Sequence, residues 1–245
     1  MAGTNEERSR DPAALLGEQV EYYRARAPEY EEWFRRQGRY SRGSKVNARW
    51  FAELAAARDR LRTFDARGDV LEIACGTGQT TSILAETATR LTALDAAPEM
   101  IDEARRRPGL WNVDFVLTDV FQWEPPRSFD SVVFTFWLSH VPAERFEPFW
   151  RLVGDALGPN GRVFFSDSLY APWATAIDHE LEDPSTGSVT RRLNDGREFR
   201  IVKRFFEPSE LQSELRGIGW DIEVRATGEL LLTGSGRPDT ADGGA

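Results

Sequence analysis

The sequence has few of the residues on which disulfide-bonded, metal-binding and nucleic-acid-binding proteins depend. It contains one cysteine, Cys75, and two histidines, His140 and His179, among 245 residues. One cysteine cannot form an internal disulfide, and the two histidines share no short spacing typical of a metal site. The formal net charge is -9, whereas a protein that binds nucleic acid along its backbone needs a basic surface. We therefore expect no disulfide framework, no metal and no nucleic-acid partner.

Long apolar runs are also missing. No run reaches the roughly 18 apolar residues that a membrane-spanning helix requires, and the polar N-terminus lacks the apolar centre of a signal peptide. These absences predict a cytoplasmic protein without a membrane partner. Residues 1–17 and the Gly-rich segment 234–245 are polar, and we expect both to be disordered. The composition leaves the oligomeric state open.

Short apolar segments alternate with amphipathic segments through the middle of the chain. Such alternation predicts an α/β fold, Rossmann-like, in which a doubly wound parallel sheet carries helices on both faces. Between the strands, helices are expected to start near Thr80 and Pro98 and to span residues 144–157. The predicted strands are residues 69–74, 90–95, 113–118, 130–136 and 161–167.

Helical patterns also precede the first strand. Residues 18–37 predict two short helices interrupted at Pro28, and apolar residues recur in phase over residues 46–63. We expect residues 18–64 to form a lid and residues 65–233 to form the ligand-binding domain. Three lid tyrosines offer hydroxyls that could close over a ligand: Tyr22, Tyr23 and Tyr30.

The most informative motif, VLEIACGTGQTT, joins the first predicted strand to the following helix. Gly76 and Gly78 allow a sharp turn and a close approach of the backbone to a ligand, and Glu72 could interact with an ammonium group. Asp95, at the end of the second strand, can accept hydrogen bonds from both ribose hydroxyls, and Asp119, after the third, from an adenine amino group. Carboxylates at the ends of three successive strands favour a nucleoside site over a Gly-rich turn in which Asp95 only caps a helix.

Four segments resemble the signatures of class I methyltransferases that depend on S-adenosylmethionine (SAM): LEIACGTGQTT, LTALDAAPEMIDEAR, FVLTDVFQW and LGPNGRVFFSDS. The match covers about residues 66–168 and is most similar to small bacterial O-methyltransferases of specialised metabolism. It implies a seven-stranded sheet whose final antiparallel hairpin comes from WDIEVRAT and ELLLTG, SAM as cofactor, S-adenosylhomocysteine (SAH) as product, and no catalytic role for Cys75. The expected SAM site comprises Tyr23, Glu72, Ala74, Gly76, Thr77, Gly78, Asp95, Ala96, Met100, Asp119, Val120, Phe121, Phe136 and Trp137.

Residues for the methyl acceptor are expected at the same edge of the sheet. His140 follows the fourth strand, where it could act as a general base or position the acceptor, or instead cap a helix. Tyr30, from the lid, is expected to take part in catalysis and, with Trp137, to contact the acceptor. His179 lies in an Asp-His-Glu segment that we expect to be solvated.

Residues 188–206 predict a β-hairpin around an Asn-Asp-Gly turn. If Leu193 faces Arg197, period-two alternation places Arg191 and Lys203 on a largely apolar face. Burying cations without partners is costly, so something anionic should meet them. We hypothesise that Arg191, Lys203 and Arg197 bind an anionic acceptor, a carboxylate or a phosphonate. The alternative is that Arg191 and Lys203 extend to water or pair with the acidic residues just before the hairpin, which are Asp178, Glu180, Glu182 and Asp183.

The preferred function is therefore SAM-dependent methyl transfer to an oxygen of a small, anionic metabolite. The insertion at residues 168–206 would lie over the active site. A phenol, alcohol or nitrogen acceptor would make His140 the candidate base. A cyclase or lyase on the same fold and a module that only senses SAM remain open. An NAD-dependent oxidoreductase is disfavoured because Thr81 replaces the third glycine of the dinucleotide-binding motif.

Overall fold

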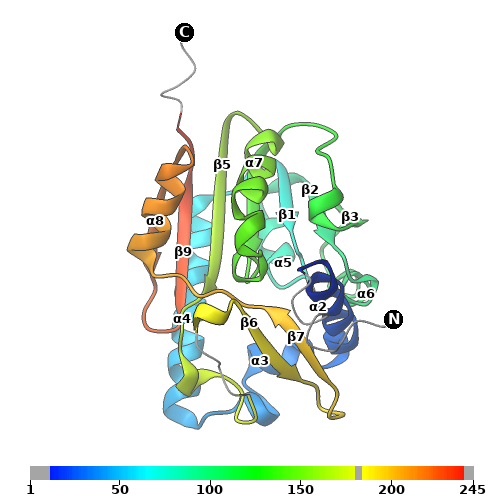
Figure 1. Cartoon of the computed structure of the whole chain (residues 1–245). Coiled ribbons are helices and arrows are strands. Elements are labelled where there is room, and N and C mark those ends of the chain that lie inside the picture. Colours follow the sequence, from blue (N-terminus) through cyan, green and yellow to red (C-terminus); the bar gives the residue numbers. More distant parts are fainter. Residues whose placement is uncertain (1–11, 180–183, 240–245) are drawn as a thin grey trace, which may run out of the picture.

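A seven-stranded sheet forms the centre of the computed structural model, which describes residues 12–179 and 184–239 (Figure 1). The strand order is β3-β2-β1-β4-β5-β9-β8, with β1 to β5 parallel and β9 antiparallel to both β5 and β8. This arrangement confirms the doubly wound sheet with a final antiparallel hairpin. The strands are β1 (Gly68–Ile73), β2 (Ala88–Asp95), β3 (Val113–Leu117), β4 (Phe129–Thr135), β5 (Leu157–Ser168), β8 (Trp220–Ala226) and β9 (Leu231–Pro238).

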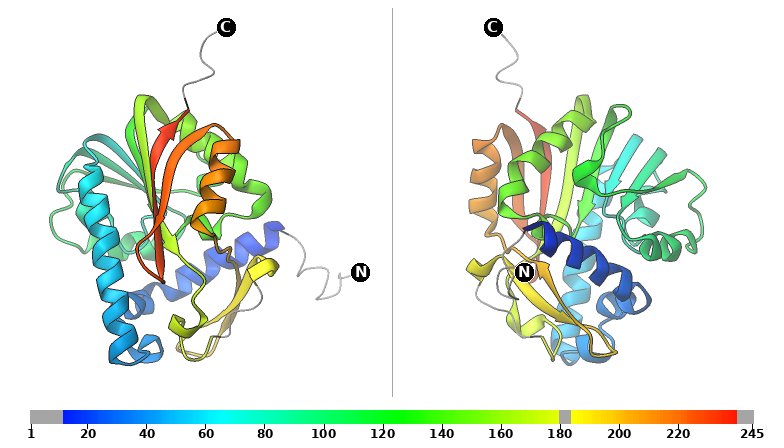
Figure 2. Two further views of the ribbon diagram at one scale, coloured as in Figure 1. Left: turned by 90° about the vertical axis from the view of Figure 1, so that its left-hand side faces the viewer. Right: turned by 45° about the vertical axis from the view of Figure 1, so that its right-hand side comes forward.

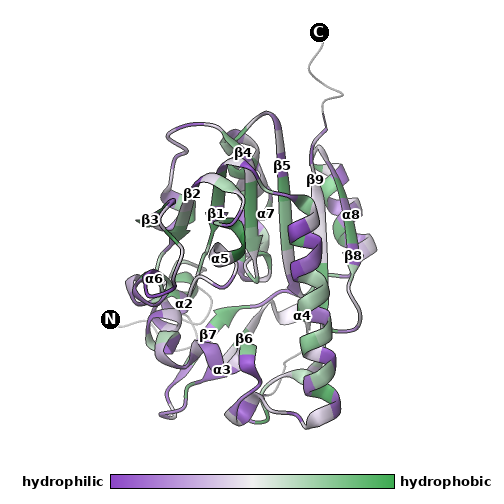
Figure 3. Cartoon of the chain, turned by 180° about the vertical axis from the view of Figure 1, so that it is seen from behind, coloured by the Kyte–Doolittle hydropathy of each residue, from purple (hydrophilic) through white to green (hydrophobic). Residues whose placement is uncertain are grey.

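Helices cover both faces of the sheet because successive strand residues point to opposite sides. On β4, Val132 and Phe134 join the apolar core beneath α7 and α8, whereas Val133 joins the core beneath α4 and α5. Figures 1 and 3 show α7 and α4 on opposite faces. Among the described residues, no helix is both long and apolar enough to cross a membrane. The helices are α4 (Ser44–Phe64), α5 (Thr81–Leu84), α6 (Pro98–Arg105), α7 (Phe146–Ala156) and α8 (Pro208–Gly217).

The N-terminal helices and a separate hairpin lie together across one end of the sheet (Figures 1 and 2). α2 (Pro12–Arg26) packs along β7 (Glu198–Val202), which pairs with β6 (Ser188–Arg192). Gln19 Oε1 accepts a hydrogen bond from the Val202 N–H at 3.0 Å, so α2 side chains cover the edge of β7 that is turned away from β6. α3 (Tyr30–Arg35) follows after a short turn of 3-10 helix.

Short 3-10 helices connect many of these elements. η1 contains Pro28 and separates α2 from α3, which confirms the interruption expected there. The 3-10 helices are η1 (Ala27–Glu29), η2 (Gly38–Tyr40), η3 (Val120–Gln122), η4 (Leu138–His140), η5 (Ala143–Arg145), η6 (Pro172–Ala174) and η7 (Pro184–Thr186).

Parts of the two segments expected to be disordered are ordered, which corrects the expectation for them. Residues 12–17 belong to α2, and residues 234–238 belong to β9. A Cβ atom on Gly236 would lie 1.9 Å from the Asp221 carbonyl oxygen of β8, so this glycine permits close strand packing. Residues 1–11 and 240–245 lie outside the described residues, and the expectation for them stays a prediction.

Candidate active site

A cavity of about 450 Å³ opens where β1, β2 and β4 end, and α2 covers it. Asp95, at the end of β2, lines this cavity. Its Oδ2 accepts from the Gly76 N–H at 2.8 Å and its Oδ1 from the Ala97 N–H at 2.9 Å. Burial raises the pKa of Asp95 to about 6. The carboxylate thus fixes the turn after β1 and the start of α6 while it faces the cavity.

The backbone turns sharply at two further points of the cavity wall. Ala74, after β1, and Phe136, after β4, have φ values of 54° and 55°, which non-glycine residues rarely adopt. Such strained positions are frequent at ligand sites. The buried indole N–H of Trp137, which lines the cavity, has no partner within the described part of the chain. The wall therefore offers a donor that a polar ligand could satisfy.

A second cavity of about 110 Å³ adjoins the first. Tyr23, Tyr30 and His140 line both cavities and so mark their junction. A ligand in one cavity and a ligand in the other would meet at these side chains.

Cationic side chains dominate the smaller cavity, which we call the cationic cavity. Arg26, Arg36, Arg191 and Lys203 line it, and its described lining includes no Asp or Glu. The Nε atoms of Arg26 and Arg36 are buried without partners among the described residues, as is the Tyr22 hydroxyl. The cavity thus contains a surplus of hydrogen-bond donors and of positive charge.

Two of these arginines are held by aromatic rings and neutral oxygens. The Arg26 guanidinium lies 4.7 Å from the ring centre of Tyr30 and donates to the Tyr40 hydroxyl at 3.3 Å. Arg36 lies 5.1 Å from the ring centre of Trp50 and donates to a backbone carbonyl. Cation–π contacts stabilise the arginines without neutralising their charge.

Lys203 is the cavity cation with an acidic partner. Its Nζ lies 3.6 Å from Asp167 Oδ1 and donates to the Ser139 hydroxyl at 2.8 Å. Asp167 is fully buried and also accepts backbone hydrogen bonds from Ser139 and Ser168. Burial lowers the pKa of Lys203, and the nearby Asp167 carboxylate opposes this effect. Lys203 therefore both pairs internally and faces the cavity.

Comparison with known proteins agrees with this geometry. A family described as "Methyltransferase domain" matches residues 70–161. A ubiquinone biosynthesis O-methyltransferase of Xanthomonas euvesicatoria pv. vesicatoria (strain 85-10) is 32% identical over 169 residues, which make up 67% of this chain and 66% of that protein. The chain thus spans slightly less than two thirds of this curated relative.

Solved structures give a fuller match. DhpI in complex with SAH aligns over 92% of this chain and 98% of its own, with 40% identity and a TM-score of 0.76. DhpI with SAM and HEP aligns over 91% and 98%, with 41% identity and the same TM-score of 0.76. The chain belongs to the class I SAM-dependent methyltransferases. SAM is therefore the cofactor of this enzyme, and a small molecule is its expected substrate.

Most residues expected to contact SAM line the larger cavity of the methyltransferase. α2 contributes further wall residues, among them Leu16, Gln19 and Val20, which carried no motif in the sequence. The expected residues found in the lining are Tyr23, Ala74, Gly76, Asp95, Ala96, Met100, Asp119, Val120, Phe121, Phe136 and Trp137.

Three other residues expected at SAM lie outside this lining. Glu72 is 1% exposed and accepts from the Thr81 hydroxyl at 2.6 Å, and burial raises its pKa to about 8. A protonated, enclosed carboxyl does not fit the ammonium-binding role expected for it. Thr77 donates instead to a carboxylate of the N-terminal helical region, Glu31 Oε1, at 2.7 Å. A Cβ atom on Gly78 would lie 3.0 Å from that of Ala104, so this glycine allows α6 to approach.

His140 uses both ring nitrogens. Nδ1 lies 2.7 Å from the Val202 carbonyl oxygen, and Nε2 lies 2.8 Å from the Tyr23 hydroxyl. Since a carbonyl only accepts, Nδ1 carries the proton and Nε2 accepts from Tyr23. Burial and the nearby Lys203 charge lower the pKa of His140 well below its usual value. This neutral imidazole orients Tyr23, which favours a positioning role over direct proton abstraction from an acceptor.

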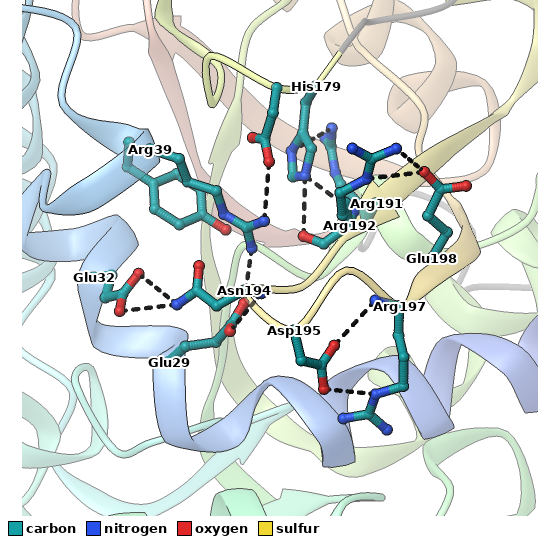
Figure 4. A network of polar contacts seen from close by, with 12 residues as sticks. Glu29, Glu32, Arg39, His179, Arg191, Arg192, Asn194, Asp195, Arg197 and Glu198 are labelled. Carbon is teal, nitrogen blue, oxygen red and sulfur yellow. Dashed lines mark hydrogen bonds and ion pairs between the residues drawn. The ribbon is translucent and has the colours of Figure 1, made fainter.

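The hairpin has the register expected from its sequence, because the Leu193 N–H donates to the Arg197 carbonyl at 2.9 Å. Arg191 and Lys203 reach the cationic cavity. Arg197 does not: its side chain is 58% exposed and pairs with Asp195 at 2.8 Å (Figure 4). The expectation that Arg197 contacts the acceptor is thereby corrected. Trp137, also expected there, lines only the larger cavity.

Proposed function

We propose that this methyltransferase transfers a methyl group to an oxygen of a small anionic acceptor, a carboxylate or a phosphonate. The observation that carries the proposal is the cationic cavity, which four cations line without a described lining carboxylate and in which, among the described residues, Lys203 alone pairs with a nearby carboxylate, Asp167. Burying such charge is unfavourable unless an anion compensates it. The O-methyltransferase activity named for the curated relative supports oxygen as the accepting atom.

In this proposal SAM occupies the larger cavity, next to the acceptor. Asp95 would accept from the ribose hydroxyls and Asp119 from the adenine amino group, with Met100 and Val120 on either side of the ring. The backbone near Phe136 would face the methionine amino group. Bound SAM supplies an electrophilic methyl on a sulfonium, which an oxyanion can attack in line while SAH departs.

The enzyme's own task is then orientation and exclusion of water. Arg191 and Lys203 would hold the acceptor anion through charge-assisted hydrogen bonds, with one oxygen toward the junction of the cavities. Tyr23, fixed by His140, and Tyr30 would line the junction of the two cavities, across which the methyl is transferred. An ionised oxygen needs no general base, which agrees with the absence of a free nitrogen on His140.

The test is a turnover assay that detects SAH release with three acceptors: methylphosphonate, acetate and a neutral phenol. Either anion should be methylated. Arg191→Met should raise the KM for the anion that is methylated about 10- to 150-fold, since a hydrogen bond to a charged group contributes about 1.5–3 kcal/mol. Arg197→Met, on the exposed end of the same hairpin, is the matched control and should leave KM unchanged.

An unchanged KM in Arg191→Met would overturn the proposed anion site. Turnover of the phenol alone would instead favour a neutral acceptor, with His140 acting through Tyr23. Consumption of SAM without SAH release would indicate a non-methylating reaction on the same fold.

A further inference from the structure

Arg191 differs from the other hairpin arginines in the chemistry of its partner. Within the described residues, its guanidinium contacts a histidine nitrogen, His179 Nδ1, at 3.4 Å. The neighbouring carboxylate of Asp178 binds Arg39 instead, at 3.3 Å, and Arg192 pairs with Glu198 (Figure 4). Arg191 and His179 both line the cationic cavity.

The contacts of His179 determine where its proton resides. A guanidinium can only donate, so Nδ1 must accept from Arg191. Nε2 faces the Arg192 backbone, 3.2 Å from its carbonyl oxygen and 3.1 Å from its amide nitrogen, and these two contacts suit either tautomer. The guanidinium decides between them: because Nδ1 accepts, Nε2 carries the proton and donates to the Arg192 carbonyl. Burial and the Arg191 charge lower the pKa of His179 to about 4, which keeps the imidazole neutral. The ring thus connects the Arg191 side chain to the backbone of the next residue.

We propose that His179 is a positioning residue for the acceptor, which holds Arg191 toward the cationic cavity through its Nδ1 lone pair. A free arginine side chain samples many rotamers, and a guanidinium that is already anchored loses less of this entropy when an anion binds. The imidazole is itself fixed, because it packs edge-on against Tyr40 at 6.4 Å between ring centres.

A neutral partner has an advantage over a carboxylate at this point. A carboxylate would compete with the acceptor for the guanidinium and cancel its charge. An imidazole accepts one N–H and leaves the full positive charge, with the remaining N–H groups, for the bound anion. His179 therefore orients Arg191 without weakening its attraction for a substrate. This inference rests on the proposed function, because it concerns the anion site.

Two isosteres separate the roles of the two ring nitrogens. In His179→Asn the side-chain oxygen takes the place of Nδ1 and can accept from Arg191. In His179→Gln the amide nitrogen takes the place of Nε2 and can donate to the Arg192 carbonyl, but nothing replaces Nδ1. The probe is methylphosphonate, titrated calorimetrically into the full-length protein saturated with SAH, with Arg191→Met and wild type alongside.

We expect His179→Gln to raise the methylphosphonate Kd at least fivefold and His179→Asn to stay within twofold of wild type. SAH affinity and Tm should be alike in the two variants. The reverse order, or equal effects of Asn and Gln, would overturn the positioning role while Arg191→Met still weakens binding. An unaltered Kd in Arg191→Met, or no binding by wild type, would refute the anion site itself and this inference with it.

Discussion

Replacing Glu72 with Gln should stabilise the fold by an amount that grows with pH. Glu72 is 1% exposed, and burial raises its pKa from 4.5 to about 8. The folded protein therefore keeps a proton that the unfolded chain releases near its ordinary pKa. Because the folded-state pKa is the higher one, the contribution of protonated Glu72 to the free energy of unfolding is complete below about pH 4.5 and is lost as pH rises to about 8. Gln has no charge and keeps an oxygen for the Thr81 hydroxyl.

The size of the effect follows from the two pKa values. A change from 4.5 to about 8 corresponds to ~5 kcal/mol in the free energy of unfolding above pH 8, and to ~3 kcal/mol at pH 7. For a chain of this size, 1 kcal/mol shifts Tm by roughly 2–4 °C. The variant should therefore melt about 10 °C above wild type at pH 7 and close to wild type near pH 4.5.

Thermal unfolding between pH 4.5 and 9, followed by circular dichroism, measures this difference. Glu86→Gln, at an exposed glutamate just after α5, is the matched control and should follow the wild-type profile. Parallel profiles for wild type and Glu72→Gln would refute the reasoning. Saturating SAM should raise Tm equally in both proteins, because Glu72 lies outside the cavity lining. A smaller SAM-induced rise in Tm in Glu72→Gln would instead support the role of Glu72 in binding the ammonium group of SAM.

Three further predictions concern the cavities and the sheet. SAH affinity should fall up to tenfold per pH unit below about pH 6, because Asp95 with a pKa of about 6 must be ionised to accept from ribose, and calorimetry with Asp95→Asn should show no such dependence. Tyr23→Phe removes the hydrogen bond to His140 and should lower kcat about fivefold, as single-turnover SAH formation would show. Gly234→Ala should lower the free energy of unfolding by about 1–3 kcal/mol in chemical denaturation, because its Cβ would lie 2.2 Å from Phe165 Cζ.

The β6–β7 hairpin shows how far a local sequence pattern reaches. Its turn residues predicted the hairpin, and alternation placed Arg191 and Lys203 on one face on the condition that Leu193 faces Arg197. The register meets that condition. The same alternation also assigned Arg197 to the acceptor. Alternation predicts the face of the hairpin to which a side chain points, but not how far along the strand the cavity extends. Arg197 lies at the exposed end of the hairpin, beyond the cavity.

The two cavity cations of the N-terminal helical region, Arg26 and Arg36, could not be identified in this way. Arg26 enters the cavity because α2 packs along β7, and Arg36 because it reaches the Ala174 carbonyl; both are contacts between segments far apart in the chain. Charged residues near helix ends are ordinarily solvated, so no local signal marks these two. Gly234 and Gly236 were assigned to a tail on composition, whereas their lack of a side chain is required by neighbouring strands.

The junction formed by Tyr23, Tyr30 and His140 has an electrostatic consequence for the catalytic cycle. In the proposed reaction, the sulfonium cation of SAM and the acceptor anion meet at this junction, where they attract each other in a medium of low polarity. Methyl transfer removes one positive charge from the donor and one negative charge from the acceptor. With the proposed anionic acceptor, the two substrates would therefore reinforce each other's binding, whereas the products would have lost that attraction and the reaction itself would promote their departure.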